Sequence, residues 1–141
     1  MGTSINARFK DFFFYWFPIF IYCLLIYIQS SYPSSEDIPS IPYFDKILHF
    51  AAYALLGALF LRAIKTLPIK DNIKLITILA ITLSSLYGIS DEIHQHYVPY
   101  RDADITDALA DIIGSIFGVY IYNFFWLERR WKERHKQPNN S

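Results

Sequence analysis

The sequence has little charge and almost no cysteine. Charged residues make up only 18% of the 141 residues, and 13 basic residues balance 13 acidic ones. Because the net charge is zero, no overall field attracts nucleic acid, and no nucleic-acid partner is predicted. The single cysteine, Cys23, can form no internal disulfide. Neither a strong net charge nor a disulfide framework therefore indicates the class of this protein.

Several signatures of catalysis and binding are also absent from the sequence. There is no nucleotide P-loop, no G-x-S-x-G elbow and no zinc pattern such as H-E-x-x-H. No internal repeat and no low-complexity run occurs. The sequence therefore predicts no metal site, and it leaves any cofactor unknown.

What the sequence has in abundance is apolar residues, at 53% of the chain. They form four segments, at about 12–28, 46–67, 73–91 and 104–126, each long enough to cross a hydrocarbon core of roughly 30 Å. The first and third segments lack the polar face that a helix of a soluble bundle needs. A cleaved signal peptide is a weaker interpretation of the first, because no small-x-small cleavage pattern follows it. We predict an all-α protein, a polytopic four-helix transmembrane bundle.

The basic residues predict the orientation of this bundle in the cell membrane. Lys and Arg gather in short cytoplasmic loops. If the N-terminus is cytoplasmic, Lys46 and Arg101 are the only Lys or Arg residues of the loops and helix ends that lie outside the cell. Both termini are then cytoplasmic. Residues 1–128 form the transmembrane domain, and residues 129–141 form a loose basic cytoplasmic tail.

Polar residues gather at the extracytoplasmic ends of the second, third and fourth predicted helices. Asp45, His49 and Tyr53 follow one another at steps of four and share one helix face. Asp91 and Gln95 end the third helix. Ionisable groups are expensive in lipid, so these side chains should face other helices or a water-filled pocket.

The fourth predicted helix carries a narrow seam of carboxylates and glycines. Asp104, Asp107, Asp111, Gly114 and Gly118 recur at steps of three or four. The G-x-x-x-G pair allows a second helix to approach closely. When each of these polar residues is considered alone, a structural role without any function explains most of them. Asp45 suits a helix N-cap, and we expect His94 and His96 to be solvated loop residues. The convergence of three helices favours a functional site.

The combined motifs resemble the VanZ-like family of bacterial membrane proteins. The pattern reads D-K-x-x-H-F-x-x-Y, then D-E-x-x-Q, then P-x-R with a downstream Asp. Tyr100 stands where the family often has Gly, and Asp111 where it often has Asn. The resemblance implies a multi-pass protein of the cell envelope, and the founding member is linked to reduced sensitivity to teicoplanin. The matching residues are Asp45, Lys46, His49, Phe50, Tyr53, Asp91, Glu92, Gln95, Pro99, Arg101 and Asp107.

These residues suggest an outward-facing pocket that binds or modifies an anionic lipid or a lipid-linked cell-wall precursor. His49 would be an acid or base, and Asp91 and Glu92 would be bases or metal ligands. Arg101 would hold the anion, and Asp107 would orient Arg101 or His49. The candidate ligand-binding residues also include Asp45, Lys46, Tyr53 and Gln95.

Two other functions stay open at this point. In the first, the protein is a non-enzymatic assembly or partner-binding factor whose polar residues only join helices. In the second, it is a small transporter or proton relay with Asp111 as the deep carboxylate. The sequence does not decide whether the protein is an enzyme, and it leaves the oligomeric state unknown.

Overall fold

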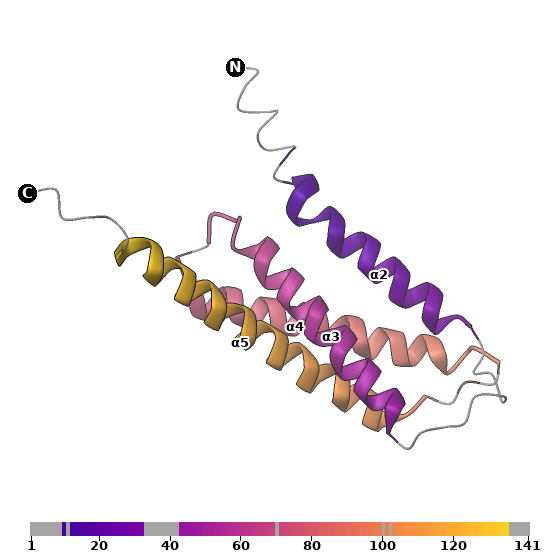
Figure 1. Cartoon of the computed structure of the whole chain (residues 1–141). Helices are drawn as coiled ribbons and strands as arrows, with labels where there is room; N and C mark the ends of the chain where they lie inside the picture. The colour runs from indigo at the N-terminus through magenta and orange to yellow at the C-terminus, as the bar shows by residue number, and fades with distance from the viewer. Residues whose placement is uncertain are drawn as a thin grey trace, which may run out of the picture.

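The computed structural model describes residues 10, 12–32, 43–69, 71–99, 101 and 103–135. The described part is helical and contains no strand (Figure 1). Four helices are long and apolar enough to cross a membrane. This confirms the predicted all-α fold with four membrane-spanning helices. They are α2 (Phe17–Ser30, extended by a turn from Phe12), α3 (Phe44–Ile64), α4 (Ile73–Gln95) and α5 (Ile105–His135).

Three helix ends, those of α3, α4 and α5, differ from the predicted ends by three residues or more. α3 ends at Ile64, four residues before Pro68, and α4 continues to Gln95. α5 continues to His135, so residues 129–135 of the expected loose tail are helical. An ion pair between Lys132 Nζ and Glu128 Oε1 supports this last part, since residues four apart are neighbours on a helix. The rest of the tail, 136–141, lies outside the described residues, as do residues 33–42 of the linker.

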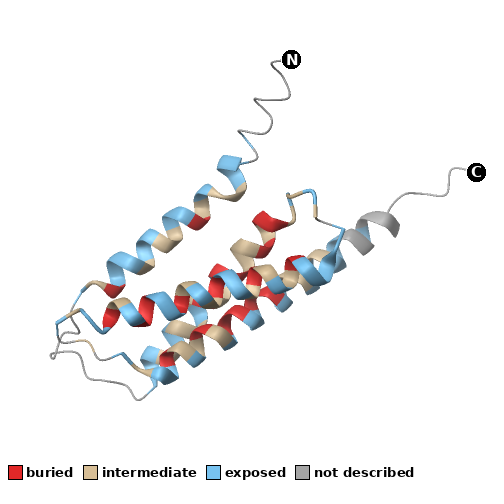
Figure 2. Cartoon of the chain, turned by 180° about the vertical axis from the view of Figure 1, so that it is seen from behind, coloured by how far each residue is buried: buried red, intermediate tan, exposed pale blue. Residues whose placement is uncertain are grey.

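The bundle has two chemically different ends, which we call the polar end and the basic end. α2 and α4 end at the polar end, and α3 and α5 begin there. The basic end is the opposite one, where α3 connects to α4 (Figure 1). α3, α4 and α5 pack against one another, whereas α2 contacts only α3 and α4 within the described chain. Exposed residues cover the outward helix faces, as expected where helices meet lipid (Figure 2).

Two glycines explain the close packing of α3 on α5. A Cβ atom on Gly114 would overlap the backbone carbonyl of Phe50, and one on Gly118 would overlap that of Ala54. The small residues of the predicted G-x-x-x-G pair therefore let the backbones touch. This contact fixes the register between the start of α3 and the start of α5, where most of the polar residues lie.

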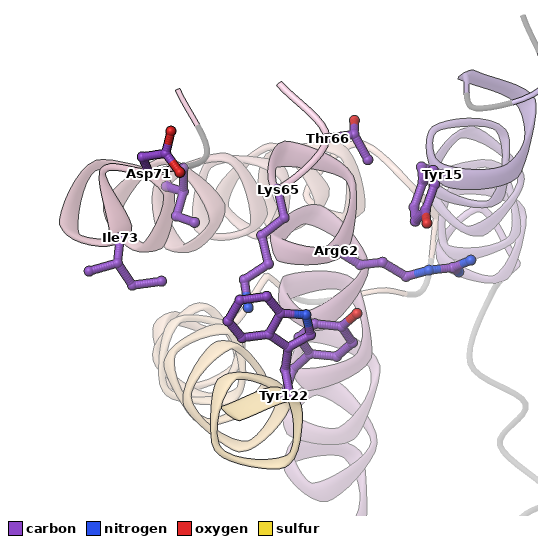
Figure 3. A pocket seen from close by; sticks show the side chains of 9 residues that line it. Tyr15, Arg62, Lys65, Thr66, Asp71, Ile73 and Tyr122 are labelled. Atoms are coloured by element: carbon purple, nitrogen blue, oxygen red, sulfur yellow. The ribbon is translucent and has the colours of Figure 1, made fainter. Parts of the chain in front are cut away.

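The basic end is held by cations that lie on aromatic rings. Lys65 Nζ lies 3.8 Å from the ring centroid of Trp126 and donates a hydrogen bond of 2.8 Å to Asn123 Oδ1. The guanidinium carbon of Arg62 lies 4.5 Å from the ring centroid of Phe14. Figure 3 shows both cations directed toward aromatic side chains. They line a pocket with a volume of about 360 Å³. Such pairs suit helix ends at a membrane interface.

Candidate functional site

The first group of charges at the polar end surrounds Lys46, and we call it the Lys46 cluster: Asp45, Lys46, Asp104 and Asp107. Lys46 Nζ donates to Asp107 Oδ1 at 2.9 Å, to Asp104 Oδ2 at 3.0 Å and to Asp45 Oδ2 at 3.2 Å. The Asp107 side chain is 9% exposed, against 58% for Asp45. The Lys46–Asp107 pair, in which the carboxylate is buried and the lysine is half-buried, therefore joins α3 to α5. Asp45 and Asp104 bind Lys46 on its more exposed side.

Asp104 also caps the N-terminus of α5, which begins at the next residue. Its Oδ1 accepts a hydrogen bond of 2.8 Å from the backbone N–H of Thr106, which is the geometry of an N-cap. This hydrogen bond, together with Lys46, lowers the pKa of Asp104 to about 2. The backbone N–H of Asp104 donates to Glu92 Oε2 at 3.2 Å and so connects the Lys46 cluster to α4.

The second group lies deeper, and we call it the His49 cluster: His49, Glu92 and Asp111. His49 Nδ1 lies 2.9 Å from Asp111 Oδ1 and 3.6 Å from Glu92 Oε1. Each residue comes from a different helix, α3, α4 or α5. Both carboxylates are buried, yet Glu92 Oε1 and Asp111 Oδ2 have no hydrogen-bond partner. One nitrogen and two carboxylates thus offer potential ligand atoms, all within 4.8 Å of one another.

Gly88 of α4 makes room for the Asp111 side chain. A Cβ atom at position 88 would lie 2.8 Å from Asp111 Cβ and 2.9 Å from Asp111 Oδ2. Real Cβ atoms do not approach other atoms so closely, so a larger residue would displace the carboxylate. The absence of a side chain at Gly88 therefore positions the His49 cluster.

Arg101 makes a third group with neutral partners. Its Nε donates to Tyr32 O at 3.1 Å, and its terminal nitrogens donate to Gln95 Oε1 at 3.1 Å and to Gln29 O at 3.2 Å. Gln95 Nε2 in turn donates to Asp91 Oδ2 at 3.2 Å. Asp107 was expected to orient Arg101 or His49, but its ion pair is with Lys46, and Arg101 forms no ion pair with a described carboxylate.

A pocket of about 550 Å³ opens between α2, α3 and α4 at the polar end. One part of its wall is polar and the other part, around Leu48 and Ala52, is apolar. The ring of Tyr53 is nearly parallel to that of His49, at an angle of 8°, and its buried hydroxyl has no hydrogen-bond partner. The lining residues are Ile26, Gln29, Ser30, Asp45, Leu48, His49, Ala52, Tyr53, Asp91, Gln95 and Arg101.

The remaining predicted site residues lie beside this pocket. Lys46 and Asp107 belong to the ion-paired contact of α3 with α5. Glu92 borders a second hollow, of about 420 Å³, together with Asp104 and His96. The structure thus brings all the predicted residues to one end of the bundle but divides them among the Lys46 cluster, the open pocket and, for Glu92, the second hollow.

Sequence reasoning missed three contributions to this end. Asp111 was placed in the seam with Asp104 and Asp107 and considered as a relay residue, but it was not counted among the candidate site residues. Gln29 and Tyr32 act through backbone carbonyls, which no side-chain motif reveals. His94 was expected to be a solvated loop residue. It lies instead within α4, 3.0 Å from Ser31 Oγ, with its ring 4.6 Å from that of Tyr27.

Fold and site together define a multi-pass membrane protein with buried polar residues at one end of its bundle. The family model described as VanZ/LLP1 matches residues 5–126, which include all four spans up to Trp126. The chain therefore belongs to the VanZ/LLP1 family, and the resemblance seen in the motifs is confirmed. No curated protein and no solved structure gives a significant match.

Proposed function

We propose that the protein binds the headgroup of an anionic lipid or of a lipid-linked cell-wall precursor in its polar-end pocket. In this role it acts in the bacterial cell envelope and affects sensitivity to teicoplanin. The observation that carries the proposal is the state of Arg101, a cation held at the pocket by oxygens that carry no charge.

The guanidinium geometry supports an anionic ligand. A guanidinium group carries five N–H donors. The three hydrogen bonds of Arg101 use one donor on each nitrogen, so each terminal nitrogen keeps one N–H. Two such N–H groups match the paired oxygens of a phosphate or carboxylate. Arg101 can therefore be oriented by Gln29, Tyr32 and Gln95 while it binds an anion.

The walls of the pocket support an amphiphile rather than a free ion. Leu48, Ala52 and Ile26 line the same pocket as Arg101 and His49. A ligand with a polar head and an acyl or prenyl tail would place its tail along the apolar wall and its head at the polar one. His49, which is hydrogen-bonded to Asp111, would be available to accept a proton from such a headgroup.

Photo-crosslinking at two neighbouring positions tests this proposal. A photoreactive residue replaces Ala52, which lines the pocket, or Ala51, which is exposed on the outside of α3. Mass spectrometry then identifies the lipids captured in cells. We expect position 52 to be enriched in anionic amphiphiles relative to position 51, and Arg101→Ala to remove that enrichment. Equal lipid profiles at the two positions would refute headgroup binding in the pocket.

The proposal also places the polar end on the outer face of the membrane. The bias of Lys and Arg toward the basic end supports this orientation. In a Cys23→Ala background, Tyr97→Cys should react with an impermeant thiol reagent added outside intact cells, whereas Asp71→Cys should not. The reverse labelling pattern would turn the pocket toward the cytoplasm and exclude a cell-wall ligand.

A further inference from the structure

The described carboxylates at the polar end outnumber the nearby cations. Lys46 and Arg101 face six carboxylates, and Lys46 is engaged by three of them. Among the described residues, neither cation forms an ion pair with the two carboxylates of the His49 cluster. The carboxylates at the polar end are Asp45, Asp91, Glu92, Asp104, Asp107 and Asp111.

The His49 cluster combines this negative charge with unused ligand atoms. Asp111 is fully buried and Glu92 is 7% exposed, and one oxygen of each has no hydrogen-bond partner. A buried oxygen without a partner loses its hydration and receives nothing in return. When both carboxylates are ionised, His49 can compensate at most one of the two negative charges. Of these two oxygens, Glu92 Oε1 lies 3.6 Å from His49 Nδ1, and Asp111 Oδ2 belongs to the carboxylate whose Oδ1 contacts the same nitrogen. The three side chains together therefore suit a positively charged ligand.

We propose that His49, Glu92 and Asp111 bind one divalent transition-metal ion such as Zn²⁺ or Mn²⁺. An imidazole nitrogen with two carboxylates suits these ions better than Mg²⁺ or Ca²⁺, which prefer oxygen ligands alone. The ion would bind Nδ1 of His49 and replace the hydrogen bond that this nitrogen now shares with Asp111.

The distances suit such an ion with small side-chain movements. Ligand bonds of about 2.1 Å place tetrahedral ligand atoms about 3.4 Å apart. His49 Nδ1 lies 2.9 Å and 3.6 Å from its two carboxylate oxygens, and the whole set of ligand atoms lies within 4.8 Å. Because the three ligands come from three helices, no local sequence pattern such as H-E-x-x-H announces them.

This metal site does not depend on the proposed headgroup binding, because the ion needs no lipid to bind. It would nonetheless assist that function. His49 also lines the pocket that contains Arg101, so a cation at His49 would add positive charge beside an otherwise acidic wall. A positively charged site adjoining the pocket favours phosphate and carboxylate headgroups.

Metal binding by the purified full-length chain tests the proposal. The protein is placed in nanodiscs of uncharged phosphatidylcholine, treated with a chelator and dialysed against Zn²⁺ or Mn²⁺. Elemental analysis should give one ion per chain. His49→Gln, Glu92→Gln and Asp111→Asn should each weaken binding at least tenfold, while the exposed control His96→Gln should bind like the wild type. Substoichiometric binding to the wild type, or unchanged affinity in the three variants, would overturn the proposal.

A spectroscopic measurement on the wild type keeps the test valid if a variant fails to fold. Electron spin-echo spectra of bound Mn²⁺ should show coupling to an imidazole nitrogen. A bound ion without nitrogen coupling contradicts the site. Loss of metal binding with intact lipid capture at position 52 would reject the metal site alone, whereas metal binding without lipid capture would reject only headgroup binding.

Discussion

The Lys46 cluster and the His49 cluster use similar residues at the same end of the bundle, yet they differ in how their charges are satisfied. Lys46 and His49 are three residues apart on α3, and each contacts a carboxylate of α5. Lys46 has three carboxylate partners and joins two helices. The His49 cluster leaves two buried oxygens without a hydrogen bond.

This difference separates a structural contact from a candidate binding site. An ion pair that includes a buried carboxylate resists opening, because removal of the cation leaves the buried charge without a partner. A cluster with orphaned oxygens is stabilised further when a ligand supplies their missing partner. The Lys46 cluster should therefore govern the stability of the bundle, whereas the His49 cluster and the Arg101 pocket should govern ligand binding.

The largest expected effect on the stability of the bundle is that of Lys46→Ala. This change leaves Asp107 buried without a cation, and we expect a loss of about 3 kcal/mol in unfolding free energy. Thermal unfolding of the purified protein measures it, and the amount of protein in membranes should fall accordingly. Lys132→Ala is the control, since its exposed pair with Glu128 should contribute less than about 1 kcal/mol. Equal stability of both variants would remove the structural role assigned to the Lys46 cluster.

A smaller effect on stability, but a clear one on binding, is expected for Gly88→Ala. The new Cβ would displace the Asp111 carboxylate from His49, at a cost of about 1–3 kcal/mol. Metal affinity should fall at least tenfold, as measured by equilibrium dialysis. The exposed residue Ser90 on the same helix provides the control, and Ser90→Ala should bind metal normally. Normal affinity in Gly88→Ala would show that the position of Asp111 does not matter.

The smallest expected effect is that of Asp104→Asn on the loss of stability at acid pH. The pKa of Asp104 is held at about 2 by the Thr106 N–H and by Lys46, below the unfolded value of about 3.9. Its stabilisation is therefore complete above pH 5 and is lost as the pH falls from about 4 toward 2. Melting temperatures measured between pH 7 and pH 3 should decline less in Asp104→Asn than in the wild type. An identical decline in both proteins would contradict this role.

The sequence supported the fold more fully than the site, for physical reasons. Helix length and apolar content reflect the thickness of the membrane, so the four spans were predictable without contacts. The convergence of polar helix ends followed from the alternating direction of the spans. The close approach of α3 to α5 could also be anticipated from Gly114 and Gly118, which allow backbones to touch.

The pairing of individual charges could not be predicted in this way. Asp107 lies one turn before Asp111 in the same seam, and spacing alone does not say which of them meets Lys46 and which meets His49. That choice depends on the relative rotation and axial shift of α3 and α5. The carbonyls of Gln29 and Tyr32 bind Arg101 only because α2 ends beside the loop that connects α4 to α5, a packing detail outside any motif.

Teicoplanin resistance measured against the amount of membrane protein tests the division into two clusters most directly. The wild type, Lys46→Ala, His49→Ala, Glu92→Gln, Arg101→Ala and Arg101→Lys are expressed in a susceptible host, and the inhibitory concentration is compared with the protein level of each. We predict that the His49, Glu92 and Arg101 variants lose resistance at nearly normal protein levels, with Arg101→Lys failing because it lacks the paired N–H groups. Resistance in Lys46→Ala should fall only in proportion to its amount. If all variants follow one common relation between resistance and protein level, the pocket has no function beyond holding the helices together.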